Sequence, residues 1–278
     1  MSHILSLLDH RLLRLAMYDT SPESVETQED PENPEFRETI ETQETRLKPA
    51  KAISDASIPC VVWAEDGLSF VHFVPTCLFD LQLIVPDEHV EAACSAITSR
   101  LPYTKMDGPC ENWLEFRIVD RRQPSCFPNS AYLKRTTPGE EDDPKNVYIH
   151  PQSFFSVDVR NYDLSTTLPP PLTDSRIRFL TRTAFLDALI ATILDPPIAF
   201  RHWRFSCMLD VYISYFLIYT LRAFPRILPS GELESEHKSV LESLKPENRP
   251  FFDGRIRRTE EGWVIEGQKR KNFLETAR

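Results

Sequence analysis

Two polar residues, Asp80 and Gln82, interrupt an apolar run that extends from Leu78 to Val85. The run predicts a strand, and residues two apart in a strand point to the same face of a sheet. Paired carboxylates at this spacing can bind Mg²⁺, which prefers charged oxygen ligands, whereas the Gln82 amide is neutral. Asp80 is therefore a candidate catalytic residue and the candidate metal ligand, and Gln82 is a candidate ligand-binding residue.

Three more carboxylates could contribute to such a site. Glu65 and Asp66 come just after a second apolar run, Ile58 to Trp63, which also predicts a strand. Asp158 is flanked by two valines in the segment Phe154 to Val159, which we expect to be a further strand piece. Glu65 and Asp66 are candidate ligand-binding residues. Asp158 is a second candidate catalytic residue, and the alternative for it is an ordinary aspartate at the end of a strand.

The elements that would position these residues follow from the apolar pattern. Residues 68–73 fit either one or two helical turns or an extended segment, and their periodicity leaves both open. Pro86 and Asp87 end the strand that begins at Leu78. Asp87 can also cap a helix whose apolar residues from Val90 to Ile97 have helical spacing. Strand, turn and helix would thus follow one another directly.

The stretch from Trp63 to Ala93, WAEDGLSFVHFVPTCLFDLQLIVPDEHVEAA, resembles the opening of a nucleotidyltransferase-like domain. It is most similar to the version found in uncharacterised fungal proteins, which reads W-G-E-D-A-L, a short helix, G-V-P-T, and then F-D-L-x-L-L-V-P-D. The resemblance implies a mixed sheet in which working enzymes hold two metal ions and a nucleoside triphosphate. Those enzymes have a Gly-Gly or Gly-Ser pair on the first turn, two carboxylates at spacing two, and a third carboxylate on a later strand.

This chain departs from that pattern at both places. Ala64, Glu65 and Asp66 stand where the glycine pair would let the backbone approach phosphates. Gln82 stands where a second carboxylate would help to hold the two metal ions. We therefore expect a degenerate nucleotidyltransferase-like protein without a cofactor, with a binding or scaffold role and no catalysis.

Two alternatives stay open. One is a divergent nucleotidyltransferase in which Asp80, with Glu65, Asp66 and Asp158, holds Mg²⁺ and a nucleoside triphosphate. The other is a protein-interaction module without a nucleotide site, in which the resemblance is accidental. No Ser-His-Asp, Cys-His or H-E-x-x-H arrangement supports a hydrolase.

Composition narrows the function classes. The chain has 278 residues and a net charge of −10, which argues against broad binding to nucleic acid and leaves protein partners open. It has only 7 glycines, and no glycine-rich phosphate loop can be found. The longest apolar helical stretch, Val211 to Leu221, is too short to cross a membrane. The 6 scattered cysteines lack zinc spacing and fit reduced thiols in a cytoplasmic or nuclear protein.

The chain divides into four predicted parts. Residues 1–18 have apolar residues at helical spacing and predict an amphipathic helix. Residues 19–53 are rich in Glu, Thr and Pro and predict a disordered acidic linker, in which Arg37, Arg46 and Lys48 are among the few basic residues. Residues 54–165 predict the nucleotidyltransferase-like α/β core, and 175–278 predict a mainly helical region packed on it. The predicted fold class is α+β.

The pattern predicts further elements within these parts. A strand is expected at residues 113–119, with Glu115 as another acid, and helices are expected at residues 181–194, 205–224 and 234–244. Residues 136–145 predict a solvated acidic loop. Residues 245–253 predict a turn bounded by prolines.

Overall fold

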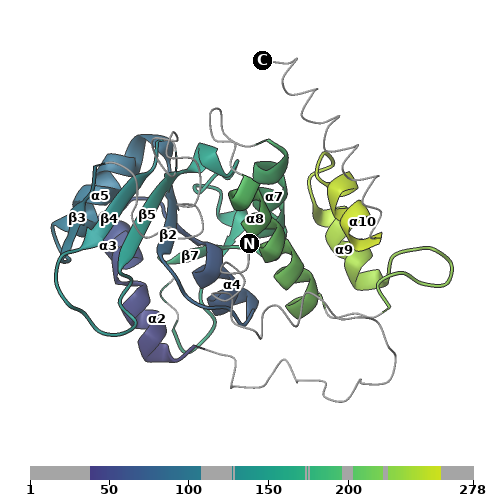
Figure 1. The fold of residues 1–278 in the computed structure, drawn as a ribbon, viewed down its shortest axis with the longest axis horizontal. Coiled ribbons are helices and arrows are strands. Elements are labelled where there is room, and N and C mark those ends of the chain that lie inside the picture. Colours follow the sequence, from purple (N-terminus) through teal and green to yellow (C-terminus); the bar gives the residue numbers. More distant parts are fainter. Residues whose placement is uncertain are drawn as a thin grey trace, which may run out of the picture. The chain divides into compact units, whose positions relative to one another are not determined.

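A mixed seven-stranded sheet organises the part of the chain that the structure describes (Figure 1). The structure is a computed structural model that describes residues 38–107, 127, 129–172, 174, 176–195, 203–221 and 225–257. The strands are β1 (Val61–Trp63), β2 (Leu81–Val85), β3 (Tyr103–Lys105), β4 (Ala131–Arg135), β5 (Asn146–Pro151), β6 (Ser165–Thr166) and β7 (Arg178–Leu180). Their order is β3-β4-β5-β2-β1-β7-β6. β1 is antiparallel to β2, whereas β2 is parallel to β5 and β1 is parallel to β7.

Helices pack on both faces of this sheet. They are α2 (Ile40–Arg46), α3 (Lys48–Asp55), α4 (Ala64–His72), α5 (Val90–Thr98), α7 (Arg182–Leu194), α8 (Trp203–Tyr219), α9 (Ser235–Ser243) and α10 (Arg249–Arg257). Short 3₁₀ turns cover Asp87–His89, Gln152–Phe154 and Tyr162–Leu164. None of the helices in the described ranges is both long and apolar enough to cross a membrane.

Alternation along the strands divides the apolar residues between two cores. Val62, Leu81 and Leu83 pack with α3 and α5 on one face of the sheet. Trp63 and Ile84 pack with α7 and α8 on the other face. Every residue of β2 is buried, so a strand buried on both faces is confirmed for Leu81–Val85. The prediction is wrong for residues 78–80, which precede the strand and include the exposed Phe79.

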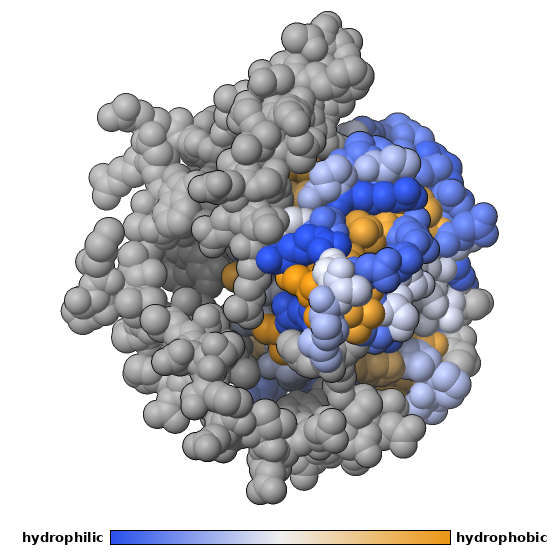
Figure 2. Space-filling model, turned by 90° about the vertical axis from the view of Figure 1, so that its right-hand side faces the viewer, coloured by the Kyte–Doolittle hydropathy of each residue, from blue (hydrophilic) through white to orange (hydrophobic). Residues whose placement is uncertain are grey.

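The C-terminal helices belong to the second of these cores. In α9, Val240 and Leu241 are partly buried against it, whereas Lys238 and Glu242 are exposed. The face of the molecule that bears α9 and α10 accordingly shows apolar residues framed by hydrophilic ones (Figure 2). This is the amphipathic pattern expected of a surface helix.

Several predicted elements are confirmed. The fold is α+β with a mixed sheet, and the two predicted strands near Trp63 and Leu83 are neighbours. The helix predicted at 181–194 is α7, and the Thr181 side chain caps it by accepting a hydrogen bond from the Ala184 N–H. Residues 68–73 lie mostly in a helix, because α4 continues to His72.

The prediction of disorder is wrong for residues 38–53, which form α2 and most of α3. The acidic composition concealed an apolar face, since Leu47, Ala50 and Ile53 recur at helical spacing and are buried. A cap supports the first helix, because the Thr39 hydroxyl accepts a hydrogen bond from the Thr42 N–H. The predicted helix at 1–18 and the remainder of the predicted linker lie outside the described residues.

Three local predictions are wrong as well. Residues 154–159 form no strand; a 3₁₀ turn and a loop stand there, and the Gln152 side chain accepts a hydrogen bond from the Val159 N–H. Asp87 does not cap α5, since a 3₁₀ turn intervenes and its carboxylate accepts from the Ser153 N–H at 3.0 Å. Residues 249–253 belong to helix α10 instead of a turn.

The boundary between sheet and helices also differs from the prediction. β7 (Arg178–Leu180) comes from the region predicted to be mainly helical, yet it pairs with β1 in the centre of the sheet. The described residues on both sides of this boundary fall in one compact unit. The strand predicted at 113–119, with Glu115, lies outside the described residues.

Candidate functional site

Asp80 directly precedes β2, and its carboxylate is held from the neighbouring strand β5. The Asn146 side-chain amide donates a hydrogen bond of 2.7 Å to one Asp80 carboxylate oxygen. The Asn146 carbonyl oxygen in turn accepts from the Tyr132 hydroxyl at 2.7 Å. Asn146 is buried, so both of its polar groups are fixed by these contacts. Asp80, the main candidate for catalysis and metal binding, thus has a carboxylate that already accepts a hydrogen bond from the Asn146 amide.

Gln82 is engaged in a second polar chain across three strands. Its side-chain oxygen lies 3.3 Å from His150 Nε2, and His150 Nδ1 lies 2.9 Å from the Ser130 hydroxyl. An amide oxygen only accepts, so Nε2 donates to Gln82 and Nδ1 accepts from Ser130. Burial lowers the pKa of His150 to about 3. The imidazole is therefore neutral, and the array links strands without charge.

The residues of β5 beside Gln82 are not carboxylates. In the parallel pairing of β2 with β5, Gln82 is opposite Tyr148, and His150 follows on the same face. The Tyr148 and His150 rings are stacked, with centroids 5.8 Å apart. The side chains of β5 beside Gln82 are thus an aromatic ring and a neutral imidazole, and neither is a carboxylate.

Asp66 forms a buried ion pair with Arg46. Arg46 Nε and Nη2 donate to the two Asp66 carboxylate oxygens at 2.5 and 2.8 Å. Arg46 Nη2 also donates to the Phe79 carbonyl oxygen at 2.8 Å, next to Asp80. The side chains are only 5% and 1% exposed, so solvent contributes little to balancing either charge.

Arg46 is the cation around which the predicted carboxylates gather. Burial opposes its charge, but Asp66, and then Glu65 and Asp80, raise the pKa of Arg46 above its ordinary value. A segment predicted to be a linker therefore supplies a fixed positive charge at the candidate site. The one hint in the sequence was the presence of a rare basic residue in an acidic segment.

Glu65 lies next to this ion pair and has an unusual environment. One carboxylate oxygen accepts a hydrogen bond from the Tyr212 hydroxyl of α8, and the other is buried and has no hydrogen-bond partner among the residues that the structure describes. Burial raises the pKa of Glu65 to about 7; Asp66 adds to this rise, whereas Tyr212 and Arg46 oppose it. Near neutral pH this carboxyl group therefore exists in both protonation states.

The backbone at Ala64 is strained. Its φ of 60° is in the left-handed region, which costs a residue with a Cβ about 1–2 kcal/mol. The chain turns here from β1 into α4, and a glycine would adopt this conformation without that cost. The resemblance places a glycine at this turn, so the sequence departs from the pattern while the backbone keeps a shape that suits glycine.

Asp158 does not join the other candidates. It is exposed in the loop after the 3₁₀ turn, and its carboxylate accepts a hydrogen bond of 3.0 Å from the Arg160 N–H. Within the described ranges no three His, Cys, Asp or Glu side chains form a group that could hold a metal ion. The structure thus brings Glu65, Asp66 and Asp80 around Arg46 and leaves Asp158 outside.

The acidic loop between β4 and β5 is more ordered than a solvated loop. Asp143 is buried and lies 2.5 Å from Arg135 Nη1 and 3.4 Å from Lys48 Nζ. Glu140 accepts from Lys48 at 3.1 Å and from the Thr45 hydroxyl at 3.0 Å. The prediction of a solvated loop is confirmed for residues 136–141, which are exposed, and wrong for Asp143, which is buried.

No model of a known protein family matches the chain, and no curated protein is significantly similar to it in sequence.

Proposed function

We propose that this chain is a degenerate nucleotidyltransferase-like protein that has a binding or scaffold role and transfers no nucleotide. The arrangement of strands supports the kinship, because it gives the mixed sheet that the resemblance implies. β1 is antiparallel to its neighbour β2, and β2 is parallel to its other neighbour, β5. The left-handed turn at Ala64 supports it too, since it lies where the resemblance has glycine.

The observation that carries the proposed loss of catalysis is the bidentate contact of Arg46 with Asp66. Two-metal catalysis needs carboxylates that share divalent cations. Here a guanidinium occupies both Asp66 oxygens, Asn146 binds Asp80, and His150 binds Gln82. Each predicted ligand in the cluster therefore already interacts with a neighbouring protein group.

Thermal unfolding with Mg²⁺ and each nucleoside triphosphate tests the proposal, on the wild type and on Asp80→Ala. A ligand at 100 times its dissociation constant stabilises the folded state by about 2.7 kcal/mol, which is readily measured. We expect that Mg²⁺ with a nucleoside triphosphate changes the midpoint of thermal unfolding equally, or not at all, in the wild type and in Asp80→Ala. Asp163→Ala is the matched control, because Asp163 is an exposed aspartate in the 3₁₀ turn Tyr162–Leu164.

A Mg²⁺-dependent shift that is lost in Asp80→Ala and kept in Asp163→Ala would overturn the proposal. It would favour the divergent nucleotidyltransferase instead. Transfer of a labelled nucleotide by the wild type, abolished in Asp80→Ala, would establish that alternative.

A further inference from the structure

Helix α2 is attached to the rest of the protein mainly by polar side chains. Ile40 is its only apolar residue, and this side chain is 49% exposed. The buried residues of α2 are Thr42, Thr45 and Arg46. A helix of seven residues has little stability of its own in water, because its first turn is costly to form. The folding of α2 therefore depends on the contacts of these three side chains.

Two of the contacts join α2 to the loop between β4 and β5. The Thr42 hydroxyl donates to Asp142 at 2.9 Å, and the Thr45 hydroxyl donates to Glu140 at 3.0 Å. The two threonines are three residues apart, so they lie on one side of the helix. Glu140 is exposed, and water competes for the hydrogen bond that it accepts. Water can therefore take the place of the threonine when α2 moves away.

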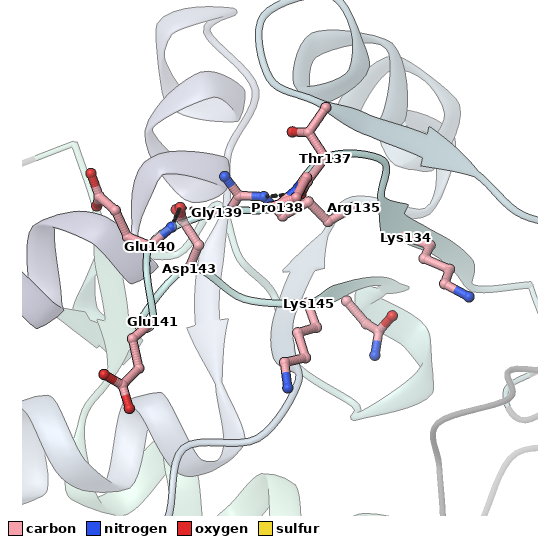
Figure 3. Close-up of a pocket in the computed structure, with 10 residues that line it drawn as sticks. Lys134, Arg135, Thr137, Pro138, Gly139, Glu140, Glu141, Asp143 and Lys145 are labelled. Carbon is pink, nitrogen blue, oxygen red and sulfur yellow. Dashed lines mark hydrogen bonds and ion pairs between the residues drawn. The ribbon is translucent and has the colours of Figure 1, made fainter.

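The loop that accepts these hydrogen bonds is fixed independently of α2. Arg135 of β4 is directed toward Asp143, and its Nη1 lies 2.5 Å from that carboxylate (Figure 3). The Asp143 carboxylate also accepts from the Glu140 N–H at 3.0 Å. Lys48, the first residue of α3, donates to the Glu140 carboxylate at 3.1 Å. The loop would thus keep its position if α2 detached, and the two threonine contacts could form again.

The third contact of α2 covers a carboxylate of the candidate site. Asp66 is fully buried, and both of its oxygens accept from Arg46. In the part of the chain that the structure describes, no other group donates to them. Both ions would regain their hydration if α2 detached, which would offset part of the attraction that they lose. Detachment of α2 would therefore uncover the Asp66 carboxylate.

Helix α3, in contrast, is held by apolar packing. Leu47, Ala50 and Ile53 belong to the core on that face of the sheet. Pro49 lies in the first turn of α3 and has no N–H, so the two helices are separated at Leu47. Segments with few buried apolar contacts open at a lower free energy than the whole fold does. This contrast favours an opening of α2 in which α3 and the sheet stay folded.

We propose that α2 is a detachable strap that controls access to the Asp66 carboxylate. In the closed state Arg46 binds both oxygens of Asp66. In the open state Arg46 stays attached to the chain but leaves Asp66, which then faces water and can meet a cationic ligand. The regulatory role rests on the proposed function, because it concerns the same binding site, whereas the opening itself requires no nucleotide.

Hydrogen exchange of the full chain, followed by mass spectrometry, measures the opening. We expect the amides of residues 43–47 in the wild type to exchange at least about tenfold faster than those of residues 51–55 in α3, after correction for their intrinsic rates. The variant Thr42→Val/Thr45→Val keeps the shape of both side chains and removes their hydrogen bonds to the loop. It should speed exchange in α2 by at least about fivefold and leave exchange in α3 unchanged.

The matched control is Thr98→Val/Thr183→Val, which removes threonine hydroxyls that contact Cys94 in α5 and Ser243 in α9. Labelling of carboxylates with a carbodiimide and glycine ethyl ester then measures access to Asp66. We expect the labelling of Asp66, relative to that of the exposed Asp163, to increase at least about fivefold in the Thr42/Thr45 variant and to stay unchanged in the control.

Three outcomes would overturn the strap: equal exchange in α2 and α3 of the wild type, equal acceleration of both helices in the Thr42/Thr45 variant, or no gain in Asp66 labelling when exchange in α2 accelerates. The first outcome needs no variant, so it decides the question even if the variant folds poorly. Neither measurement includes Mg²⁺ or a nucleotide, so the result is separate from the Asp80 test of the proposed function.

Discussion

Arg46 and Asp66 form a two-point ion pair, at 2.5 and 2.8 Å, between helices α2 and α4. The pair is buried, so each partner depends on the other for the balance of its charge. Its position beside Glu65 and Asp80 gives the candidate site a permanent cation from its own chain. The charge that a divalent metal would contribute to such a cluster is here covalently attached and cannot be exchanged.

Replacing Arg46 by Met should destabilise the fold by about 3–5 kcal/mol, because Asp66 would stay buried without a counter-charge. The paired variant Arg46→Met/Asp66→Leu should regain most of that loss, since neither charge is then buried alone. Urea unfolding of the two single variants and the double variant measures this coupling as a double-mutant cycle. A loss below about 1 kcal/mol in Arg46→Met would contradict the buried pair.

Glu65 should make stability fall with rising pH. Its pKa rises from 4.5 to about 7 on folding. Between these values the folded protein keeps a proton that the unfolded chain releases, so stability decreases up to about pH 7 and then levels off. At about 1.4 kcal/mol for each pKa unit, the loss is on the order of 3 kcal/mol.

The variant Glu65→Gln isolates this effect, because its amide is neutral at every pH and can still accept from Tyr212. We expect it to be more stable than the wild type above pH 7 and similar to it near pH 4.5. Urea unfolding from pH 5 to 8 on both proteins gives the difference, in which other titrating groups cancel. A difference that does not change with pH would refute the raised pKa of Glu65.

The parts of the fold that sequence reasoning found are those with a local signal. β2 is an apolar run that only Gln82 interrupts, and α7 has both an apolar stripe and a capping threonine at position 181. α2 and α3 were not predicted, because the segment that contains them is rich in acidic and polar residues and their burial depends on a sheet that forms from later residues. The composition of a short segment does not show that a sheet built from later residues will cover its apolar side chains.

The candidate site could be predicted only in part, because only some of its residues have a local signal in the sequence. Asp80, Glu65 and Asp66 were identified by type and spacing, and the structure does bring them around one charge. Their partners Arg46 and Asn146 were missed, because each lies far from its carboxylate in the chain and neither belongs to a motif. Only the strand and helix packing determines that these groups meet.

The turn at Ala64 should respond to glycine differently from an ordinary helical alanine. Ala64→Gly relieves a left-handed conformation worth about 1–2 kcal/mol and removes one buried methyl group worth about 1 kcal/mol, so its net effect should be small. Ala93→Gly, in the interior of α5, removes a buried methyl group and also loosens a helix. We expect Ala93→Gly to cost at least about 1 kcal/mol more in urea unfolding. Equal losses would show that Ala64 is not strained.

Asn146 donates a hydrogen bond to the Asp80 carboxylate, and its replacement by Asp tests that contact. The Asn146→Asp variant places a carboxylate where an amide donates to Asp80 at 2.7 Å. Two carboxylates so close cannot both be ionised without a large cost, so the pKa of one of them should rise. The variant should therefore lose a few kcal/mol of stability at pH 7 and regain part of it as the pH falls toward 4.

Asn146→Ala is the control for that variant, because it removes the same hydrogen bonds without adding charge and should cost about 1–3 kcal/mol at every pH. Adding Mg²⁺ then shows whether Asn146→Asp loses stability because two carboxylates repel each other or only because hydrogen bonds are lost. Paired carboxylates supply the oxygen ligands that Mg²⁺ prefers, so millimolar Mg²⁺ should restore stability to Asn146→Asp and leave Asn146→Ala and the wild type unchanged. If the two variants lose equal stability at all pH values and neither responds to Mg²⁺, the Asp80–Asn146 contact does not control the charge at this site.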